Sequence, residues 1–299
     1  MTNPLDMKGP EFLGFYIVYG LGVFLLAGLI RLFWHRAYEA APGARWRPGV
    51  YPAEGDAYTL ALLRGGVREV ALTILGRLMV EGFFVLDGNV LREPRNPGSN
   101  RSRLSTLEEG ALAAITPGLD PPQALSRVEK ALEPGLAGAR TDLEMAGLAP
   151  GPAQRRGYRR IGLGALLLVT GLGLAKLLVA LMRGRSNVQF LIILLIVSVV
   201  ASVRLMKPPL QTAAGKRYLK WLQESHKGLA EMVSSGRRHG FGELALVAGI
   251  FGLEILPTLA PLKQALIPPP SSGSDGGGGD SSGCGGGGGC GGGCGGCGG

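Results

Sequence analysis

The sequence predicts a mainly α-helical fold: three or four transmembrane helices, a small cytoplasmic helical domain with a winged-helix-like β-hairpin, and a disordered Gly/Cys-rich tail. Three observations predict it. Long apolar blocks with few charges alternate with polar stretches. Residues 56–149 repeat apolar side chains at the spacing of amphipathic helices. In residues 271–299, 18 of 29 positions are glycine, which cannot bury apolar area.

The composition excludes a simple soluble globule. Charged residues make up 18% of the 299-residue chain, below the roughly 25% typical of soluble domains. The apolar blocks equally exclude a fully disordered chain. The net charge of +9 arises from 31 Lys and Arg against 22 Asp and Glu, so the distribution of basic residues along the chain can indicate membrane orientation.

Three apolar blocks predict membrane spans, each requiring about 20 mostly apolar residues. Phe12 to Ile30 carries no charge. It lacks the basic start and the small-residue cleavage site of a signal peptide, so we expect an uncleaved span. Ile161 to Met182 is charged only at Lys176, and Ser186 to Val203 is uncharged. The short gap between these two blocks predicts an antiparallel helical hairpin.

The fourth apolar block, Phe241 to Leu262, contains Glu243 and Glu254 and two prolines near its end. A charge at the bilayer centre costs about 2.5–3.5 kcal/mol. The sequence therefore leaves two alternatives for this block: a membrane span, or a re-entrant or interfacial helix. The two intramembrane charges are Lys176 and Glu254. Lys176 either snorkels to the membrane surface or pairs with Glu254, provided that the fourth block spans.

Basic residues set the expected orientation. Arg and Lys cluster after the first block, before the second and after the third, and only Arg183 and Arg185 disagree. The positive-inside rule then places the N-terminus outside and residues 35–160 and 207–240 on the cytoplasmic side of the membrane. The tail lies outside if the fourth block spans and inside if it does not.

The expected organisation has six parts. They are an N-terminal transmembrane helix (1–34), a cytoplasmic winged-helix-like domain (35–160), a transmembrane helical hairpin (161–206), a basic amphipathic juxtamembrane segment (207–240), a fourth transmembrane or interfacial helix (241–267) and the tail (268–299).

Within residues 35–160, local signals predict a helix–turn–helix followed by a hairpin. Asp56 can cap a helix to Arg64, Gly65-Gly66 breaks it, and a second helix runs over Val67 to Glu81, with Gly82 as its C-cap. Residues 83–86 and 90–91 then form a hairpin around an Asp-Gly-Asn turn. This is the element order of a winged helix. The charges on 67–81 are mixed, which disfavours DNA binding.

A second helical unit is expected after this hairpin. Ser105 and Glu108 have the spacing of a capping box. A longer helix begins at Asp120, carries apolar residues to Met145 and closes at Gly147.

The segment 207–240 predicts a basic amphipathic helix with Leu219, Leu222, Leu229 and Met232 on one face. The candidate lipid-headgroup residues are Lys216, Arg217, Lys220 and Trp221. The alternative is that this apolar face packs on the cytoplasmic domain, and both roles can coexist.

The four cysteines all lie in the tail, with the spacing C-x5-C-x3-C-x2-C: Cys284, Cys290, Cys294 and Cys297. They are weak zinc candidates, since only the last pair has a typical ligand spacing. The alternatives are that the cysteines form disulfides, or that they have no specific role in a low-complexity tail. We expect no cofactor.

No catalytic motif is present: the sequence lacks H-E-x-x-H, G-x-S-x-G and a P-loop, and its three histidines have no nearby ligand partners. The paired glycines Gly162/Gly164 and Gly171/Gly173 lie in a span and favour close helix packing. We therefore expect no enzyme activity, catalytic residues or small-molecule substrate. The expected partners are membrane lipids and an unidentified protein, with nucleic acid disfavoured.

The stretch A-Y-T-L-A-L-L-R-G-G-V-R-E-V-A from Ala57 onward resembles the A-Y-L-x-G-G core of a family of bacterial integral membrane proteins of uncharacterised activity. The segments Leu104 to Glu108 and Phe251 to Leu253 are also similar. Members often end in Gly- or Gly/Cys-rich tails. The resemblance implies a membrane location and this fold, and no activity.

The leading hypothesis is a non-enzymatic integral protein of a bacterial cytoplasmic (inner) membrane that anchors a cytoplasmic protein-interaction domain. The alternatives are a membrane-tethered DNA-binding regulator and a transport or channel component that uses Lys176 and Glu254.

Overall fold

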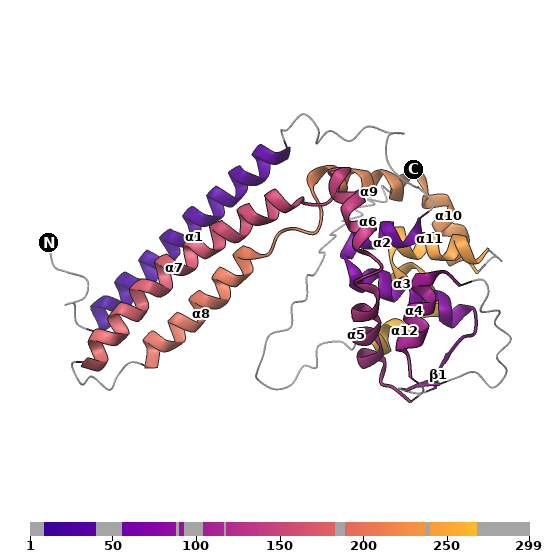
Figure 1. Ribbon diagram of the computed structural model, residues 1–299, viewed down its shortest axis with the longest axis horizontal. Helices are drawn as coiled ribbons and strands as arrows, with labels where there is room; N and C mark the ends of the chain where they lie inside the picture. The colour runs from indigo at the N-terminus through magenta and orange to yellow at the C-terminus, as the bar shows by residue number, and fades with distance from the viewer. Residues whose placement is uncertain are drawn as a thin grey trace, which may run out of the picture. The chain divides into compact units, whose positions relative to one another are not determined.

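The computed structural model describes residues 9–39, 56–87, 90–92, 104–116, 118–182, 189–236 and 240–267 (Figure 1). Within these residues the chain is mainly helical, with twelve α-helices and one two-stranded sheet. Three of the helices are long and apolar enough to cross a membrane: α1 (Gly9–Glu39), α7 (Pro152–Met182) and α8 (Gln189–Met206). We call them the three long helices. They coincide with the three predicted spans.

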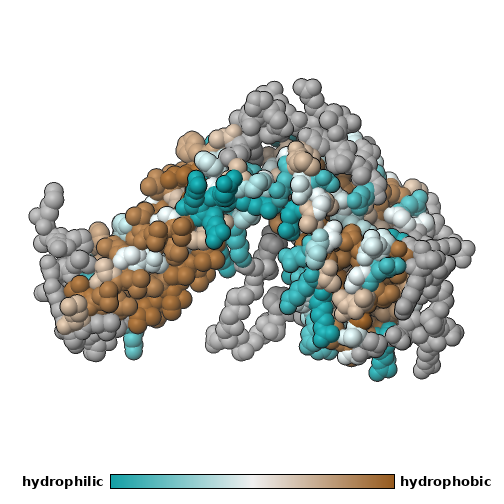
Figure 2. Space-filling view, viewed as in Figure 1, coloured by the Kyte–Doolittle hydropathy of each residue, from teal (hydrophilic) through white to brown (hydrophobic). Residues whose placement is uncertain are grey.

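The outward faces of the three long helices are apolar, as the brown surface in Figure 2 shows. Leu25, Leu167 and Val197 are 69%, 64% and 60% exposed. Contiguous apolar surface of this extent is unfavourable in water, whereas lipid hydrocarbon solvates it. Backbone polar groups are satisfied inside each helix, as a spanning segment requires.

Glycines on α7 allow the long helices to pack closely. A Cβ atom at Gly162 would lie 2.8 Å from the backbone nitrogen of Met206 on α8, and one at Gly173 would lie 2.7 Å from the hydroxyl oxygen of Tyr16 on α1. These contacts pair the start of α7 with the end of α8, and the end of α7 with the start of α1. Both neighbours are therefore antiparallel to α7, and the predicted hairpin of α7 and α8 is confirmed. Small residues at such crossings are the usual means of close packing between membrane helices.

The remaining elements form a separate hydrophobic core, which we call the helical domain. They are α2 (Ala57–Gly65), α3 (Val67–Val80), β1 (Val85–Asp87), β2 (Val90–Arg92), α4 (Thr106–Ala114), α5 (Pro121–Leu132), α6 (Ala137–Met145), α9 (Ala213–Ser225), α10 (Lys227–Ser234), α11 (Phe241–Phe251), η4 (Leu253–Ile255), η5 (Pro257–Leu259) and α12 (Ala260–Leu266).

The helical domain is built from chain segments on both sides of the α7–α8 hairpin. The side-chain amide of Gln211 donates to the carbonyl oxygens of Leu63 and Arg64, both at 2.9 Å, and the backbone N–H of Thr212 donates to Leu148 at 3.0 Å. The segments expected at 207–240 and 241–267 therefore pack on the domain expected at 35–160, which agrees with the alternative in which the apolar face of 207–240 packs on that domain. The two later segments complete the core of the first because it would otherwise expose the apolar faces of α2 and α3.

Helices α2 and α3 begin and end where local chemistry predicts. The carboxylate of Asp56 accepts hydrogen bonds from the backbone N–H groups of Tyr58 and Thr59, at 3.1 and 3.3 Å. Gly66 has a φ of +79°, a conformation that glycine adopts at little cost, and it separates α2 from α3. Gly82 has a φ of +78° just after α3 ends. The predicted helix–turn–helix is confirmed.

The predicted hairpin is present as a short antiparallel pair. Val85 is opposite Arg92, and Asp87 is opposite Val90. The strands are three residues each, and the first begins two residues later than expected. Phe83 and Phe84, which precede them, are buried. The winged-helix assignment of the whole unit stays a prediction.

The long helix expected between Asp120 and Gly147 is two helices, and this prediction was wrong. Helix α5 ends at Leu132 and α6 begins at Ala137. Pro134 explains the break, since its ring clashes with the carbonyl four residues earlier in a continuing helix. Met145, which was assigned to the apolar face, is 75% exposed.

The fourth apolar block is not a helix of spanning length, and it packs in the core of the helical domain. Helix α11 has 11 residues, about 16 Å at 1.5 Å per residue, and a bilayer core is about 30 Å thick. It ends at Gly252, whose φ is +100°, and Pro257 disfavours continuation of the same α-helix through the residues that follow. Val247, Ile250 and Leu253 are buried in the core of the helical domain. The run is apolar because it is buried in protein, and hydropathy alone does not separate that case from burial in lipid.

Candidate functional site

The basic clusters of the three long helices meet at one end of the bundle, which we call the basic end. The guanidinium of Arg31 on α1 donates to the carbonyl oxygens of Leu205 and Lys207 at the end of α8, at 2.9 and 3.0 Å. The Tyr158 hydroxyl on α7 lies 3.0 Å from Nδ1 of His35. Figure 2 shows hydrophilic surface at this end, next to the apolar surface. The expectation that the three clusters share one side agrees with this geometry.

A small pocket of about 240 Å³ lies at the basic end. Its described lining comes from α1, α7 and the segment after α8: Gly28, Arg31, Leu32, His35, Tyr158 and Pro209. The Arg31 guanidinium carbon lies 5.0 Å from the centre of the Tyr158 ring, within the range of a cation–π contact.

The two predicted intramembrane charges do not meet, so the proposed Lys176–Glu254 ion pair is wrong. The ammonium of Lys176 lies 4.7 Å from the centre of the Phe12 ring, among the long helices. Glu254 belongs to the helical domain and accepts a hydrogen bond from Lys263 at 2.5 Å. That bond holds the pKa of Glu254 below its ordinary value. The pair fails because the block that carries Glu254 is not a span.

The predicted headgroup residues lie on α9. Lys216, Arg217 and Lys220 are exposed. Trp221 is half-buried against the core, and its ring stacks on Tyr218 with centres 6.2 Å apart. Leu222 is fully buried, while Met232 is 44% exposed. The apolar face of this segment thus packs on the helical domain, and Met232 does not belong to it. Its basic face remains accessible.

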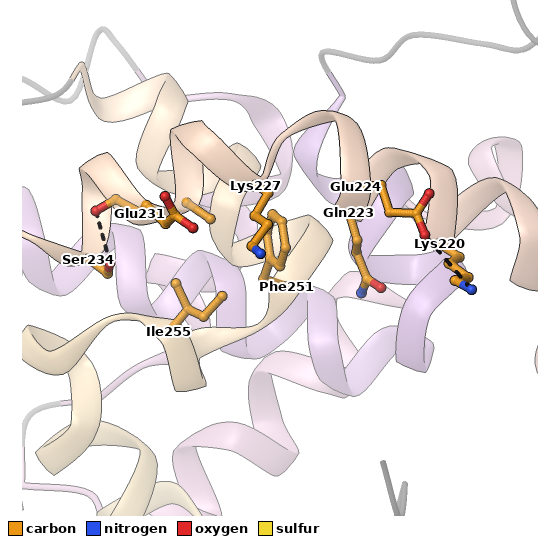
Figure 3. A pocket seen from close by; sticks show the side chains of 9 residues that line it. Lys220, Gln223, Glu224, Lys227, Glu231, Ser234, Phe251 and Ile255 are labelled. Carbon is orange, nitrogen blue, oxygen red and sulfur yellow. Dashed lines mark hydrogen bonds and ion pairs between the residues drawn. The ribbon is translucent and has the colours of Figure 1, made fainter. Parts of the chain in front are cut away.

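An open groove of about 420 Å³ crosses the helical domain between α9–α10 and the end of α11 (Figure 3). Nine of the described residues line it: Lys220, Gln223, Glu224, Lys227, Ala230, Glu231, Ser234, Phe251 and Ile255. Its floor is apolar and its rim carries charges of both signs. The side-chain amide of Gln223 donates to the carbonyl oxygen of Ile250 at 3.2 Å, which fixes α9 against α11.

A buried ionic network joins α2, α3 and α4. The carboxylate of Glu108 is fully buried and accepts from Arg77 at 2.5 Å and from the backbone N–H of Ser105 at 2.7 Å. The Tyr58 hydroxyl donates to the same carboxylate. The predicted capping box of Ser105 and Glu108 is confirmed, but the role of Glu108 in the network was not predicted. We interpret this network as structural, because each charged group has a partner.

The environment of the network shifts two pKa values. Burial, followed by the hydrogen bond to Glu108, raises the pKa of Tyr58 well above its ordinary value. Burial alone would lower the pKa of Arg77, but hydrogen bonds to Glu81 and Tyr58 outweigh it, and the pKa lies above its ordinary value. Arg77 therefore stays charged.

Helix α3, the candidate DNA-recognition helix, is central to the core. Eight of its fourteen residues are buried, and it contacts α2, α4, α5 and α11. A recognition helix needs a free face to enter the major groove. Among the described elements, this packing leaves α3 no such face, which counts against the DNA-binding alternative.

In the described part of the chain, no three His, Cys, Asp or Glu side chains are grouped as metal ligands. The candidate zinc cysteines Cys284, Cys290, Cys294 and Cys297 lie outside the described residues, as do Arg183 and Arg185. Neither a protein-family model, nor a curated protein sequence, nor a solved structure matches this chain. The resemblance to the bacterial family with Gly/Cys-rich tails stays a prediction from the quoted residues.

Sequence reasoning missed both the groove and the pocket at the basic end. Their linings join segments that are separated in sequence, such as Arg31, Tyr158 and Pro209 in the pocket. The one local signal for the groove was the alternation of Lys220, Glu224, Lys227 and Glu231 at helical spacing.

Proposed function

We propose that this chain is a non-enzymatic integral membrane protein that anchors a docking domain at the cytoplasmic face of a bacterial inner membrane. Three helices of spanning length support the anchor. The gathering of basic side chains at one end of these helices supports an orientation with that end in the cytoplasm, since Lys and Arg are retained on that side. The helical domain then also lies in the cytoplasm.

The groove of Figure 3 is the observation that carries the docking role. Phe251 and Ile255 are half-buried and offer an apolar floor, while Lys227 and Glu231 are on the rim. An apolar centre within a polar rim is the usual anatomy of a protein interface. The occupant that fits is a segment of a partner protein with one apolar side chain flanked by an acidic and a basic residue.

The charged side chains on the rim of the groove can change their ion-pair partners at little cost in free energy. Lys220 and Glu224 form an ion pair at 3.8 Å with side chains 78% and 67% exposed. Such exposed pairs contribute about 0–1 kcal/mol. A partner segment with complementary charges can therefore replace this pair, and the charges select its register and orientation.

The test exchanges the rim charges without altering the net charge. In Lys227→Glu/Glu231→Lys, the floor is intact but the charge pattern is reversed. The matched control is Asp87→Lys/Arg92→Glu, which exchanges an exposed pair on the hairpin.

A photo-crosslinking residue, p-benzoylphenylalanine, replaces Ser234 at the groove or, as a position control, Met145 on α6. Partners crosslinked in cells are identified and purified.

Binding of the purified partner to the full chain in phosphatidylcholine nanodiscs is then measured. We expect crosslinking at Ser234 and not at Met145. We also expect a dissociation constant about tenfold higher for the groove exchange, equivalent to about 1.4 kcal/mol, and unchanged binding for the hairpin exchange. Equal affinities for the two exchanges, or equal crosslinking at both positions, would contradict the proposal.

A further inference from the structure

The pocket at the basic end is formed by residues of all three long helices or their immediate continuation. Helix α1 contributes Gly28, Arg31, Leu32 and His35, helix α7 contributes Tyr158, and Pro209 follows α8. Leu32 gives the pocket an apolar wall and is exposed on α1, whose outward face is apolar. Arg31, His35 and Tyr158 give the same pocket its polar groups. The pocket therefore lies where hydrocarbon gives way to the polar headgroup region.

Arg31 is held in place by the fold rather than extended into solvent. It donates to two carbonyl oxygens of the α8 terminus and lies over the Tyr158 ring. Carbonyl and ring contacts orient a guanidinium without neutralising its charge. No Asp or Glu is among the described residues that line the pocket. A preorganised positive charge in a cavity without a carboxylate favours an anionic ligand.

The second polar group of the pocket is also fixed. Tyr158 is 1% exposed, and its hydroxyl bonds Nδ1 of His35 at 3.0 Å. This bond sets the orientation of the imidazole ring, which lines the same pocket as Arg31. An arginine and an oriented histidine on one side of a small cavity suit the several acceptor oxygens of a phosphate group.

We propose that this pocket binds a phosphate-bearing anion through Arg31 and His35. The chemistry is shared by an anionic phospholipid headgroup and by free phosphate. The apolar wall and the position at the basic end fit the headgroup, since basic pockets between membrane helices bind anionic headgroups. The site is distinct from the exposed lysines of α9 and goes beyond the docking role.

The test uses the full chain and three substitutions. Gly28→Leu fills the pocket without changing its charge, and the space next to the Gly28 Cα is open, so the bundle tolerates it. Arg31→Gln removes the oriented charge. The matched control, Arg36→Gln, removes the same charge from an exposed position on the same helix. If Arg31→Gln fails to fold, Gly28→Leu alone still tests the pocket.

Two probes separate the sources of phosphate. Native mass spectrometry from detergent measures the retention of phosphatidylglycerol against phosphatidylcholine, and calorimetry measures the binding of inorganic phosphate. We expect one retained phosphatidylglycerol, bound about tenfold more weakly by Gly28→Leu and Arg31→Gln and about equally by Arg36→Gln.

Saturable binding of inorganic phosphate with the same variant pattern, without retained phosphatidylglycerol, would support the site and assign it to a soluble anion. The proposal is overturned if neither probe binds, or if Arg36→Gln weakens binding as much as Arg31→Gln. Partner docking in phosphatidylcholine nanodiscs is measured without either probe, so the docking proposal can fail or succeed independently.

Discussion

Among single residues, Arg77 and Glu108 form the most buried of the described ion pairs in the helical domain. Glu108 is 0% exposed and Arg77 is 19% exposed. An isolated buried carboxylate carries a large desolvation penalty, so removing one partner of the pair is costly even where the intact pair adds little net stability. The hairpin pair Arg92–Asp87, at 2.8 Å, has side chains 64% and 60% exposed. The two pairs differ in burial and provide a matched comparison.

We expect Arg77→Met to destabilise the helical domain by about 3–5 kcal/mol, because Glu108 is left buried without its cation. Arg92→Met should change stability by about 0–1 kcal/mol. Urea denaturation of the full chain in detergent, followed by tryptophan fluorescence, measures both, because Trp221 at the edge of the core contributes to this signal. Similar midpoints for the two variants would contradict a structural role for the network.

Tyr58 makes the domain sensitive to alkaline pH. Its pKa is raised in the folded state by burial and by Glu108, so the folded state retains the phenol proton that the unfolded state loses near pH 10. The contribution of Tyr58 is therefore fully present below about pH 10. Above that pH, stability should fall by about 1.4 kcal/mol per pH unit until the folded-state pKa is reached.

The measurement is the absorbance of tyrosinate during an alkaline titration of the wild-type chain and of Tyr58→Phe. In the wild type, the signal of this one tyrosine should appear only as the helical domain unfolds. In Tyr58→Phe, the alkaline loss of stability should be shallower. Ionisation of Tyr58 near pH 10 in the folded protein would refute the assignment.

At the element scale, α7 organises the three long helices through the spacing of its glycines. Gly162 and Gly173 are in close contact with α8 and α1, whereas Gly164 and Gly171 have no atom within 4 Å of a Cβ position. Two of the four glycines that the sequence singled out therefore lie in helix contacts and two do not. Which two was not predictable, because it depends on the rotation of α7 relative to its neighbours.

Gly162→Ala should loosen the crossing of α7 and α8. Its new Cβ would lie 2.8 Å from the backbone nitrogen of Met206, which cannot move without shifting α8. We expect a cost of about 1–3 kcal/mol, as for overpacking in a well-packed core. Gly164→Ala adds the same methyl group to open space and should be close to neutral. Thermal unfolding of the two variants in the same detergent measures the difference, and equal midpoints would contradict the packing.

Local signals predicted the elements whose boundaries depend on local chemistry. Asp56 caps α2, and Ser105 with Glu108 caps α4, because each motif satisfies backbone donors within four residues. Pro134 is a signal for a helix break, but the apolar spacing on both sides of it favours one continuous helix, and that spacing led to the wrong prediction. The location of the block around Val247 could not be predicted from local sequence, because a short apolar helix has the same sequence pattern whether it is buried in lipid or in a protein core.

At the scale of the whole molecule, the candidate sites depend on contacts between distant segments. The groove requires α10 to lie against the chain after α11, and the pocket requires α1 to meet the end of α8. Periodicity and composition predict that a chain forms helices and where basic residues gather. They do not predict which helices pack together, so neither site could be predicted from the sequence.

The number of spans now fixes the side of the membrane on which the chain's tail lies, given the proposed orientation. Three crossings that begin outside finish inside, whereas four would finish outside. With α11 assigned to the core of the helical domain, Cys284, Cys290, Cys294 and Cys297 should be cytoplasmic and mainly reduced.

A membrane-impermeant maleimide applied to intact cells tests this topology. We expect the four tail cysteines to react only after the cells are permeabilised. A variant with these cysteines replaced by serine and with Thr2→Cys near the N-terminus should react in intact cells. Labelling of the tail in intact cells would contradict the prediction. The Thr2→Cys result then identifies the error: if Thr2→Cys also reacts, the number of crossings is wrong, and if it does not, the orientation is reversed.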